Sequence, residues 1–550
     1  MKMKKWFAAF VGFVLVLALG ITAVACETDT GNEGGDGDDT TDVAVTGVSL
    51  DKTSLELLEG ETAVLTATVT PDNATDKTVS WISSAQSVAT VSETGTVTAV
   101  SVGRATITAT AGGVSATCVV TVSEEGISVT DTQSLFEAVE TAEAGAIIRL
   151  TAGTYAFNDN LYIDKSLTLS GSGSVVIERG TENWGTNSTG RTSLITVAAD
   201  DVTIRNVTVQ GAETIGSNYA HGINVWQSEN VRIENVVAKD NDGVGVLVND
   251  SAVTLSNVQT SGNGWGGVNV DTGKASGSTS LTLESGCSFA EVLAIYCDSA
   301  AMAENVEVTA AGYHEATVTL AGSENVVRHV WTTNEAITDG SFIAGDAAGL
   351  RNAVAAAPAG AGSKIVLVEN TYALNANLAL DKALTIEGIG EVVIEKGTES
   401  WETNSAGRTS LITIAADDVT IRNVTVQGAE TIGSNYAHGI NVWQSENVRI
   451  ENVVAKDNDG VGVLVNDSAV TLSNVQTSGN GWGGVNVDTG SNTNTTSLTV
   501  DAACAFGETF QIYCDSKAMA EEITVTADGY TAAETADQNK NMRYVWTKNA

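Results

Sequence analysis

Proline is almost absent from this sequence, with two residues in 550, and basic residues are scarce, with 27 against 67 acidic ones. The resulting formal net charge of −40 excludes a nucleic-acid-binding surface and disfavours contact with anionic lipid headgroups. A polyanionic glycan would bind such a surface only through bridging cations. The lack of proline, combined with 55 glycines, fits stacked strands joined by tight corners.

Long apolar runs are missing after residue 26, so no later segment is expected to span a bilayer. Residues 1–26 have a basic start, an apolar centre and small residues before Cys26, which predict a secretory signal. Their end resembles a bacterial lipobox, although Ala23 stands where leucine is usual. The resemblance implies a lipid on Cys26, and ordinary cleavage is the alternative. Residues 27–42 are acidic and lack apolar anchors, which predicts a disordered tether.

The rest of the chain is organised around a block that occurs twice. Residues 190–273 return at 407–490 with one change, Val197 to Ile414, and a constant shift of 217 (407 minus 190). Within the block, a strand that begins with glycine recurs at Gly222, Gly245 and Gly267, which lie 23 and then 22 residues apart. A repeat of this length is typical of a solenoid.

Each short repeat alternates apolar and polar residues, so one face of its strands is apolar. A single coil cannot bury that face alone, and coils must therefore stack at about 4.8 Å per step. Asn206, Asn235 and Asn257 fall in one corner column, where stacked amides can hydrogen-bond to one another. This pattern resembles the right-handed parallel β-helix of the pectin-lyase-like superfamily, whose members include lyases, hydrolases, epimerases, adhesins and inactive domains.

Residues 43–123 alternate through several short strands with evenly spaced turn signals, which predicts a small β-sandwich. The stretch VSWISSAQSVATVSETGTVTAVSVGRATITA and the following CVVTV resemble a bacterial immunoglobulin-like group 2 domain. The resemblance implies a spacer or adhesion module, with Trp81 as its core aromatic and Cys118 as a buried thiol. The predicted fold class is therefore all-β, a sandwich followed by β-helices.

Two β-helices are expected, because each copy begins with its own short capping helix. In the first copy a capping box at Ser134 and Glu137 predicts the helix start. A helix here would cover the open end of the solenoid. We therefore predict a first β-helix at 127–331, a linker at 332–346 and a second β-helix at 347–550.

Four cysteines close the two copies at matching positions. Secretion permits disulfides, and inward sulfurs on neighbouring strands could meet. Free buried thiols are the alternative. We predict the pairs Cys287–Cys297 and Cys504–Cys514.

Carbohydrate-active proteins of the fold that this chain resembles usually work on the outer face of the sheet made by the Gly-initiated strands. One outward column is expected to contain Asn224, Leu247, Asn269 and Tyr296, and the next Trp226, Asn249, Asp271 and Asp298. Two close carboxylates could perform glycoside chemistry or hold Ca²⁺ with Asp250. The catalytic candidates are Asp271 and Asp298, with their counterparts Asp488 and Asp515. For a lyase, Lys239 and Arg232 are available as a base, but no motif marks either.

Aromatic residues near the same face could stack on sugar rings. The candidates are Trp226, Tyr219 and Trp265 in the first copy and Trp443, Tyr436 and Trp482 in the second, with His221 just before the strand. The Asp-x-Asp-Gly fragments at Asp240, Asp242, Asp457 and Asp459 offer metal ligands, but they lack the remainder of a calcium loop. Such residues usually serve as corners.

The sequence favours a lipid-anchored, non-catalytic protein outside the cytoplasm that displays two β-helices. Its partner would be a polysaccharide or another cell-surface component, with no nucleic acid and with membrane contact only through the anchor. Two linked sites would gain affinity through effective concentration. A polysaccharide lyase or glycoside hydrolase is the alternative, and a scaffold without ligand is the third reading. No cofactor is required, and Ca²⁺ is an optional ligand.

Overall fold

The computed structural model describes residues 42–549, apart from 124, 182–192, 215–219, 274–276, 361, 400–409, 432–436, 491–495 and 538. It separates into two units, one ending at Ser123 and one beginning at Glu124. Cys26 and the predicted signal and lipidation site lie outside the described residues, as does the tether up to residue 41. Among the described residues, none of the helices has the length and apolar character needed to cross a membrane.

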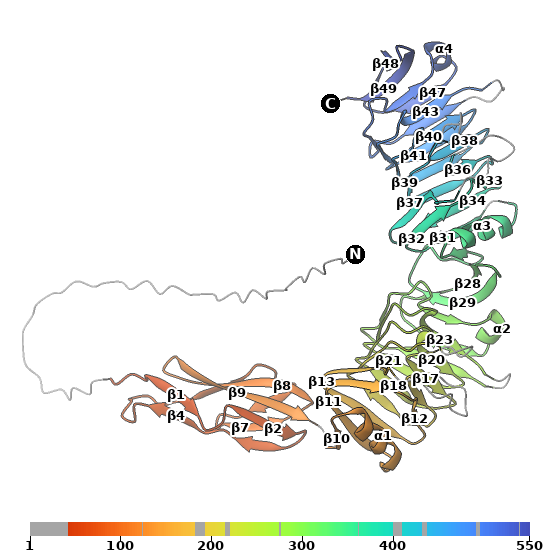
Figure 1. Cartoon of the computed structure of the whole chain (residues 1–550). Coiled ribbons are helices and arrows are strands. Elements are labelled where there is room, and N and C mark those ends of the chain that lie inside the picture. The colour runs from red at the N-terminus through yellow and green to blue at the C-terminus, as the bar shows by residue number, and fades with distance from the viewer. Residues whose placement is uncertain are drawn as a thin grey trace, which may run out of the picture. The chain divides into compact units, whose positions relative to one another are not determined.

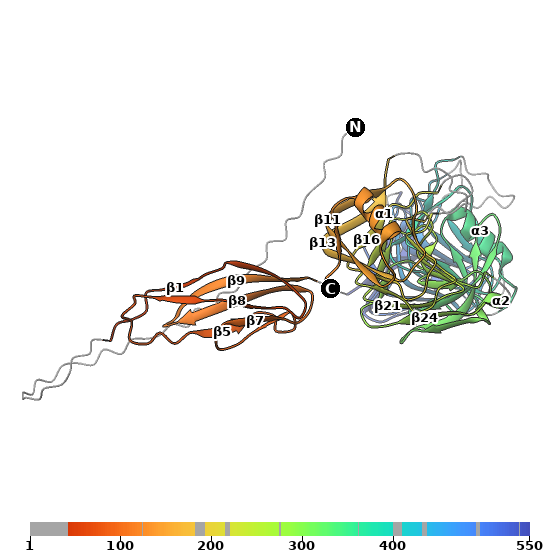
Figure 2. The same cartoon turned by 90° about the horizontal axis from the view of Figure 1, so that it is seen from below.

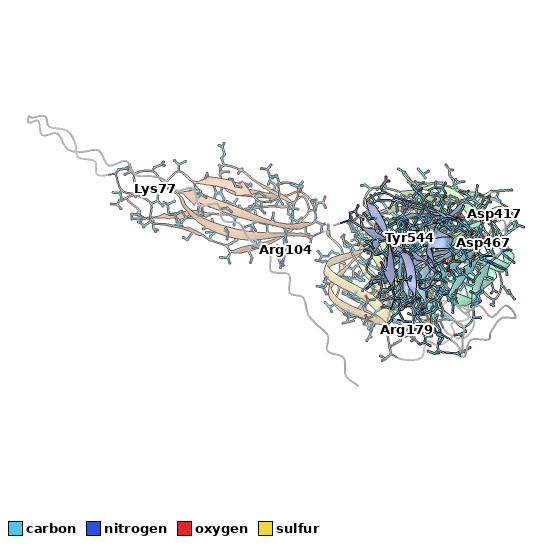
Figure 3. All side chains as sticks on the ribbon, turned by 90° about the horizontal axis from the view of Figure 1, so that it is seen from above. Lys77, Arg104, Arg179, Asp417, Asp467 and Tyr544 are labelled. Carbon is cyan, nitrogen blue, oxygen red and sulfur yellow. The ribbon has the colours of Figure 1, made fainter. Side chains whose placement is uncertain are left out.

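The first unit is a β-sandwich of short strands, as predicted. Cys118 and Val120 are fully buried in its core, and Trp81 packs against that core from a partly exposed position. Lys77 and Arg104 belong to its exposed surface (Figure 3). Its strands are β1 Gly47–Leu50, β2 Ser54–Leu58, β3 Thr62–Val64, β4 Ala67–Thr70, β5 Ser80–Ser83, β6 Ala89–Val91, β7 Thr96–Ala99, β8 Gly103–Ala111 and β9 Val114–Ser123.

The second unit consists of stacked coils whose strands pair in parallel with the coil before and after (Figure 1). In each copy, the Gly-initiated strands form one sheet, which we call the front sheet. In the first copy it contains β12 Leu161–Ile163, β14 Ile195–Val197, β17 Ile223–Trp226, β20 Val244–Asn249, β23 Gly266–Asp271 and β26 Ile295–Cys297. In the second copy it contains β33 Leu378–Leu380, β36 Ile412–Ile414, β38 Ile440–Trp443, β40 Val461–Asn466, β43 Gly483–Asp488 and β46 Ile512–Cys514.

The remaining walls of the coils are built from the alternating strands that follow each corner. In the first copy these are β10 Ile127–Val129, β11 Ala146–Phe157, β13 Leu167–Arg179, β15 Thr203–Arg205, β16 Thr208–Gln210, β18 Val231–Glu234, β19 Val237–Lys239, β21 Ala252–Ser256, β22 Gln259–Ser261, β24 Thr279–Leu283, β25 Ser288–Phe289 and β27 Val306–Thr309. In the second copy they are β30 Phe342–Ala344, β31 Ser363–Leu367, β32 Asn370–Leu374, β34 Leu384–Gly388, β35 Val392–Lys396, β37 Thr420–Gln427, β39 Val448–Lys456, β41 Ala469–Ser473, β42 Gln476–Ser478, β44 Ser497–Val500, β45 Ala505–Phe506 and β47 Thr524–Ala527.

The predicted asparagine column is confirmed. Asn235 Nδ2 donates to Asn206 Oδ1 at 3.0 Å, and Asn257 Nδ2 donates to Asn235 Oδ1 at 2.9 Å. All three residues have positive φ angles of 50–58°, a conformation that asparagine tolerates better than most residues. The ladder therefore fixes one corner of three successive coils.

Each copy begins with a helix that covers the first coils, α1 Thr132–Thr141 and α3 Ala347–Ala356 (Figure 2). The capping residue differs from the prediction at Ser134. Asp131 is the N-cap of α1 and accepts from the Ser134 backbone, while the Ser134 side chain completes the capping box. The helix therefore starts at Thr132, three residues earlier than a cap at Ser134 would place it. Asp346 caps α3 in the same way and accepts from Gly349 N at 2.7 Å. Two shorter helices are α2 Ala300–Ala303 and α4 Lys517–Ala520.

Each copy ends with an antiparallel hairpin, β28 His314–Ala321 with β29 Val326–Thr332, and β48 Tyr530–Ala536 with β49 Met542–Lys548. The predicted linker at 332–346 is wrong as a linker, because part of it is a strand. β30 pairs in parallel with β28 on one side and with β31 on the other, so the sheet continues from one copy into the next. A carbonyl oxygen of the hairpin, that of Ala321, would lie 2.5 Å from a Cβ at Gly349, and glycine is therefore required for this close approach.

The predicted disulfides Cys287–Cys297 and Cys504–Cys514 are also wrong, since all four cysteines are free thiols. Cys287 precedes β25 and Cys297 ends β26, and these strands belong to different walls of the coil. The Cys287 Sγ donates to the carbonyl of Leu255, and the Cys514 Sγ donates to that of Ser516. Two cysteine side chains that both point into the coil are therefore not close enough to form a disulfide when their strands belong to different walls.

Candidate functional site

The first outward column of the front sheet is buried, in contrast to its predicted exposure. Asn224 and Asn269 are buried, and Tyr296 is only 2% exposed. The Asn269 side chain donates to the Tyr296 carbonyl at 3.3 Å, and Leu247 packs against the same apolar cluster as Tyr296. Residues far along the sequence cover this column, and they include Val330 and Ile337. This column therefore offers little open surface in the first copy.

The structure brings the predicted aspartates together in the second column. The backbone N–H of Asp298 donates to Asp271 Oδ1 at 2.8 Å, and that of Asp515 donates to Asp488 Oδ1 at 3.3 Å. An arginine then pairs with the outer carboxylate of each pair. Arg328 Nη2 lies 3.3 Å from Asp298 Oδ1, and Arg543 pairs with Asp515.

Burial is the main cause of a raised pKa in the inner aspartates. It raises the pKa of Asp271 to about 6, with the nearby Asp298 carboxylate adding to the rise. The pKa of Asp488 is likewise raised to about 6 by burial and by Asp515. An acid with such a pKa can exchange protons near neutral pH, which is a requirement for general acid or base catalysis.

The raised pKa values predict how stability depends on pH. A carboxyl with a folded pKa of about 6 and an unfolded pKa near 3.8 favours the folded state when it is protonated. This stabilisation is complete below the unfolded pKa and is lost as the pH rises through about 6. Replacing Asp271 and Asp488 with asparagine should therefore raise stability at pH 7.5, on the order of 2 to 3 kcal/mol for each site. Urea unfolding of the wild type and of each asparagine variant should show that the gain in free energy of unfolding shrinks towards pH 4. A gain that does not depend on pH would contradict this prediction.

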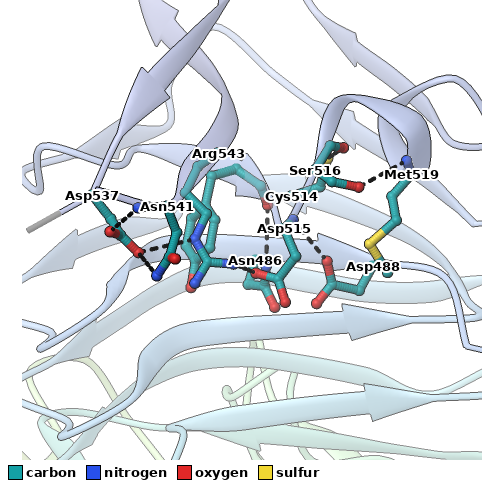
Figure 4. A network of polar contacts seen from close by, with 10 residues as sticks. Asn486, Asp488, Cys514, Asp515, Ser516, Met519, Asp537, Asn541 and Arg543 are labelled. Atoms are coloured by element: carbon teal, nitrogen blue, oxygen red, sulfur yellow. Dashed lines mark hydrogen bonds and ion pairs between the residues drawn. The ribbon is translucent and has the colours of Figure 1, made fainter. Parts of the chain in front are cut away.

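In the second copy, the aspartate pair belongs to a longer row of paired charges (Figure 4). Arg543 lies between Asp515 and Asp537, and its Nε is 3.4 Å from Asp537 Oδ2. Asp537 also accepts from the backbone and side chain of Asn541. The outer carboxylate that glycoside chemistry would use as nucleophile or base is therefore already neutralised by a guanidinium.

A pocket of about 680 Å³ lies beside this row, at the last coil of the second copy. Its lining includes Trp482, Glu508, Phe510, Tyr513 and Arg543. The Trp482 side chain is among the exposed large apolar side chains, at 41%. An exposed indole at the wall of a polar pocket can stack against the apolar face of a sugar ring.

His438 helps to orient the Trp482 ring. The two rings meet edge to face with centroids 6.3 Å apart. His438 Nδ1 accepts from the Val461 backbone at 3.1 Å, and burial lowers the pKa of His438 to about 4. The imidazole is therefore neutral at pH 7 and adds no positive charge to the pocket. His221 and Trp265 repeat the arrangement in the first copy with centroids 6.2 Å apart.

The other sequence candidates are dispersed. Trp226 and Trp443 end front-sheet strands β17 and β38 and are partly buried, whereas Tyr219 and Tyr436 lie outside the described residues. Asp240 is an exposed corner residue 3.4 Å from Lys239 Nζ, and Asp242 accepts from the Thr214 backbone at 2.7 Å. Asp457 and Asp459 repeat these corners, with Asp459 accepting from Thr431 at 2.7 Å. In the part of the chain that is described, no three His, Cys, Asp or Glu side chains gather where they could hold a metal ion.

Sequence reasoning missed Glu508, Phe510, Asp537 and Arg543 as neighbours of Trp482. A signal was present, because the two copies diverge in this last coil after being nearly identical through residue 490. Val292 becomes Thr509, Leu293 becomes Phe510 and Leu320 becomes Asp537. These replacements at corresponding positions indicate that the two ends have different surroundings.

Two family models match parts of the chain. Residues 44–122 match the bacterial Ig-like domain (group 2), and residues 410–541 match the right handed beta helix region. The chain is thus all-β, with an Ig-like domain followed by a right-handed β-helix region, which confirms the predicted fold class.

Similar proteins include glycosidases and an adhesin. An alpha-L-arabinofuranosidase from Bifidobacterium longum subsp. longum is 52% identical over 84 residues, which are 15% of this chain and only 8% of that protein. The match lies in the Ig-like part. A family 28 exopolygalacturonase from Yersinia enterocolitica is 10% identical, with a TM-score of 0.27 and coverage of 85% of this chain and 99% of that one. The adhesin PfbA from Streptococcus pneumoniae is 9% identical, with a TM-score of 0.25 and coverage of 77% and 100%.

Proposed function

We propose that this chain is a non-catalytic cell-surface protein that binds carbohydrate through its β-helix region. The Ig-like domain would act as a spacer, and Cys26 would carry the lipid that anchors the protein outside the cytoplasm. The observation that supports binding most directly is the pocket of about 680 Å³ with the exposed Trp482 indole at its wall. Aromatic residues beside convergent polar groups are typical of saccharide sites.

The alternative is a glycoside hydrolase that uses the paired aspartates. The raised pKa of Asp488, about 6, favours it, because a general acid needs a proton near neutral pH. The pairing of Asp515 with Arg543 disfavours it, since the second carboxylate is not free to attack or to activate water. We therefore place the binding function first.

The test is a glycan array on the full chain, with product release from each bound polysaccharide assayed in parallel. Trp482→Ala should weaken binding of the selected glycan at least tenfold, because the ring loses its stacking area. Asp488→Asn, which keeps the size of the side chain, should leave binding unchanged. If product is released and Asp488→Asn stops the release while glycan still binds, the enzyme alternative is correct.

A further inference from the structure

The indole at the wall of the pocket has a twin in the first copy, on a corner of the same geometry. Trp265 is 37% exposed and Trp482 is 41% exposed, so both indoles are open to solvent. Each follows a Ser-Gly-Asn-Gly stretch and precedes two glycines, within the blocks that the two copies share. The Trp265 backbone donates to Gly243 O at 3.0 Å, and the Trp482 backbone donates to Gly460 O at 3.0 Å. The chain therefore presents two exposed indoles in the same way.

A neutral imidazole contacts the first indole as another contacts its twin. The rings of His221 and Trp265 meet edge to face, like those of His438 and Trp482. His221 Nδ1 accepts from the Val244 backbone at 3.1 Å, and burial lowers the pKa of His221 to about 4. The imidazole therefore carries no charge at pH 7. An indole that is already oriented by such a contact loses less conformational freedom when a sugar ring stacks against it.

A carboxylate is fixed close to the first indole by the residues that precede it. Glu291 Oε1 accepts from the Asn263 side chain at 2.6 Å and from the Asn263 backbone at 3.2 Å. Glu291 Oε2 accepts from Thr260 Oγ1 at 2.5 Å. A carboxylate has about four lone-pair positions, so these three donors leave one position on Oε2. Because Glu291 is partly exposed, a hydroxyl group of a ligand can donate to that position.

The second copy repeats this carboxylate inside the pocket. Glu508 accepts from the Asn480 side chain at 2.6 Å and from Thr477 Oγ1 at 2.5 Å. Glu508 and Trp482 both line the pocket of about 680 Å³. An indole for the apolar face of a sugar and a carboxylate for its hydroxyl groups are complementary contacts for one saccharide. The same two groups are therefore available in both copies.

The two surfaces differ in the residue that corresponds to the second aromatic ring of the pocket. Phe510 lines the pocket, whereas Leu293 stands at the corresponding position of the first copy. Leu293 is partly buried and packs against the apolar cluster that contains Tyr296. An aliphatic side chain that is already packed in this way offers a sugar less contact area than a ring does. We therefore expect weaker binding beside Trp265 than in the pocket.

We propose that Trp265 and Glu291 form a second saccharide site, with the same chemistry as the site of Trp482 and Glu508. Its ligand is a pyranose that places an apolar ring face on the indole and a hydroxyl group on the carboxylate. The proposal rests on the proposed function and adds a second position for the same glycan. Both sites lie where the chain enters front-sheet strands β23 and β43, at the end of those strands opposite to the paired aspartates.

The number of sites can be measured by isothermal titration of the full chain with xylohexaose, cellohexaose and maltohexaose. With a hexasaccharide that binds, the wild type should take up two equivalents with unequal affinities. Trp265→Ala should remove the weaker equivalent and Trp482→Ala the tighter one, and the double variant should bind none. One equivalent in the wild type, unchanged by Trp265→Ala, would refute the second site and leave the proposed function in place.

Immobilised glycan gives a second measurement, because two linked sites can hold one surface together. Trp265→Ala should weaken binding to the glycan array about tenfold or more, as Trp482→Ala does. Trp265→Phe keeps an aromatic ring of smaller area and should recover most of that loss. Equal melting of these variants by circular dichroism shows that they are folded. Array binding by folded Trp265→Ala that equals the wild type would overturn the second site.

Tyr162→Ala is the control for position within the first copy. Tyr162 is 43% exposed on the outward face of front-sheet strand β12, and its counterpart in the second copy is Ala379. Both equivalents should bind to Tyr162→Ala as they do to the wild type. Loss of the weaker equivalent in Tyr162→Ala but not in Trp265→Ala would move the site to the front sheet and overturn this proposal. Failure of every hexasaccharide and of the glycan array would instead remove the proposed function, together with the second site.

Discussion

Replacing Val225 with aspartate is expected to unfold the first β-helix and to leave the second one folded. Val225 is fully buried in β17, between Val197 and Val248 of the adjacent coils. A carboxyl group there has no polar partner in the apolar core, and the expected loss exceeds about 4 kcal/mol. The effect should stay in one copy because the two large cores share no buried residue.

Calorimetry and circular dichroism of the full chain can check this expectation. The twin variant Val442→Asp should remove the transition of the second β-helix instead, because Val442 is equally buried, with Ile414 in place of Val197 on the neighbouring strand. Gln227→Asp, at an exposed corner next to β17, is the control and should melt like the wild type. A single transition that shifts as a whole in both valine variants would show that the two cores unfold together.

The second large effect is expected at the junction. Ile337→Asp places a charge in the cluster that joins the two copies, where Ile337 is fully buried beside Tyr296 and Ile343. Residues 334–341 should detach from the hairpin, and the local loss of stability should be about 3 kcal/mol or more. Limited proteolysis and hydrogen exchange should show new cleavage and faster exchange in this segment.

Glu335→Ala, an exposed change two residues away, is the matched control and should leave exchange unchanged. Cleavage confined to residues 334–341 with both cores still protected would support a junction that opens locally. Loss of protection across β31 and β34 would instead mean that the second core depends on the junction for its stability.

Much of the fold could be predicted because its determinants repeat locally. The spacing of Gly222, Gly245 and Gly267 specifies the coil, and the column from Asn206 to Asn257 specifies one corner. A helix that covers the first coil of each copy follows from the same reasoning, since an uncovered solenoid end exposes apolar side chains.

The junction and the site could not be predicted, because they depend on contacts between segments far apart in the sequence. Nothing in the local pattern of residues 332–346 indicates that β30 pairs with β28, and a stretch between two repeats resembles a linker. Tyr296 alternates as an outward residue, yet it is buried in one apolar cluster with Val330 and Ile337, which lie far along the sequence. Cys287 and Cys297 both have an inward phase, yet they occupy different walls, which only the closed coil defines.

The close approach of Gly349 to Ala321 has a consequence for how the gene can change length. Ser134 stands at the corresponding position of α1, and its Cβ and hydroxyl would collide with a hairpin docked in the same way. The final hairpin of one molecule therefore cannot dock against α1 of another molecule in the way that β28 docks against α3 within the chain. Unequal crossing-over between the near-identical blocks adds or removes a whole unit of 217 residues, giving chains of 767 or 333 residues (550 plus or minus 217). Each product keeps the α1 cap and the hairpin of β48 and β49, so the length of the chain changes in whole β-helix units.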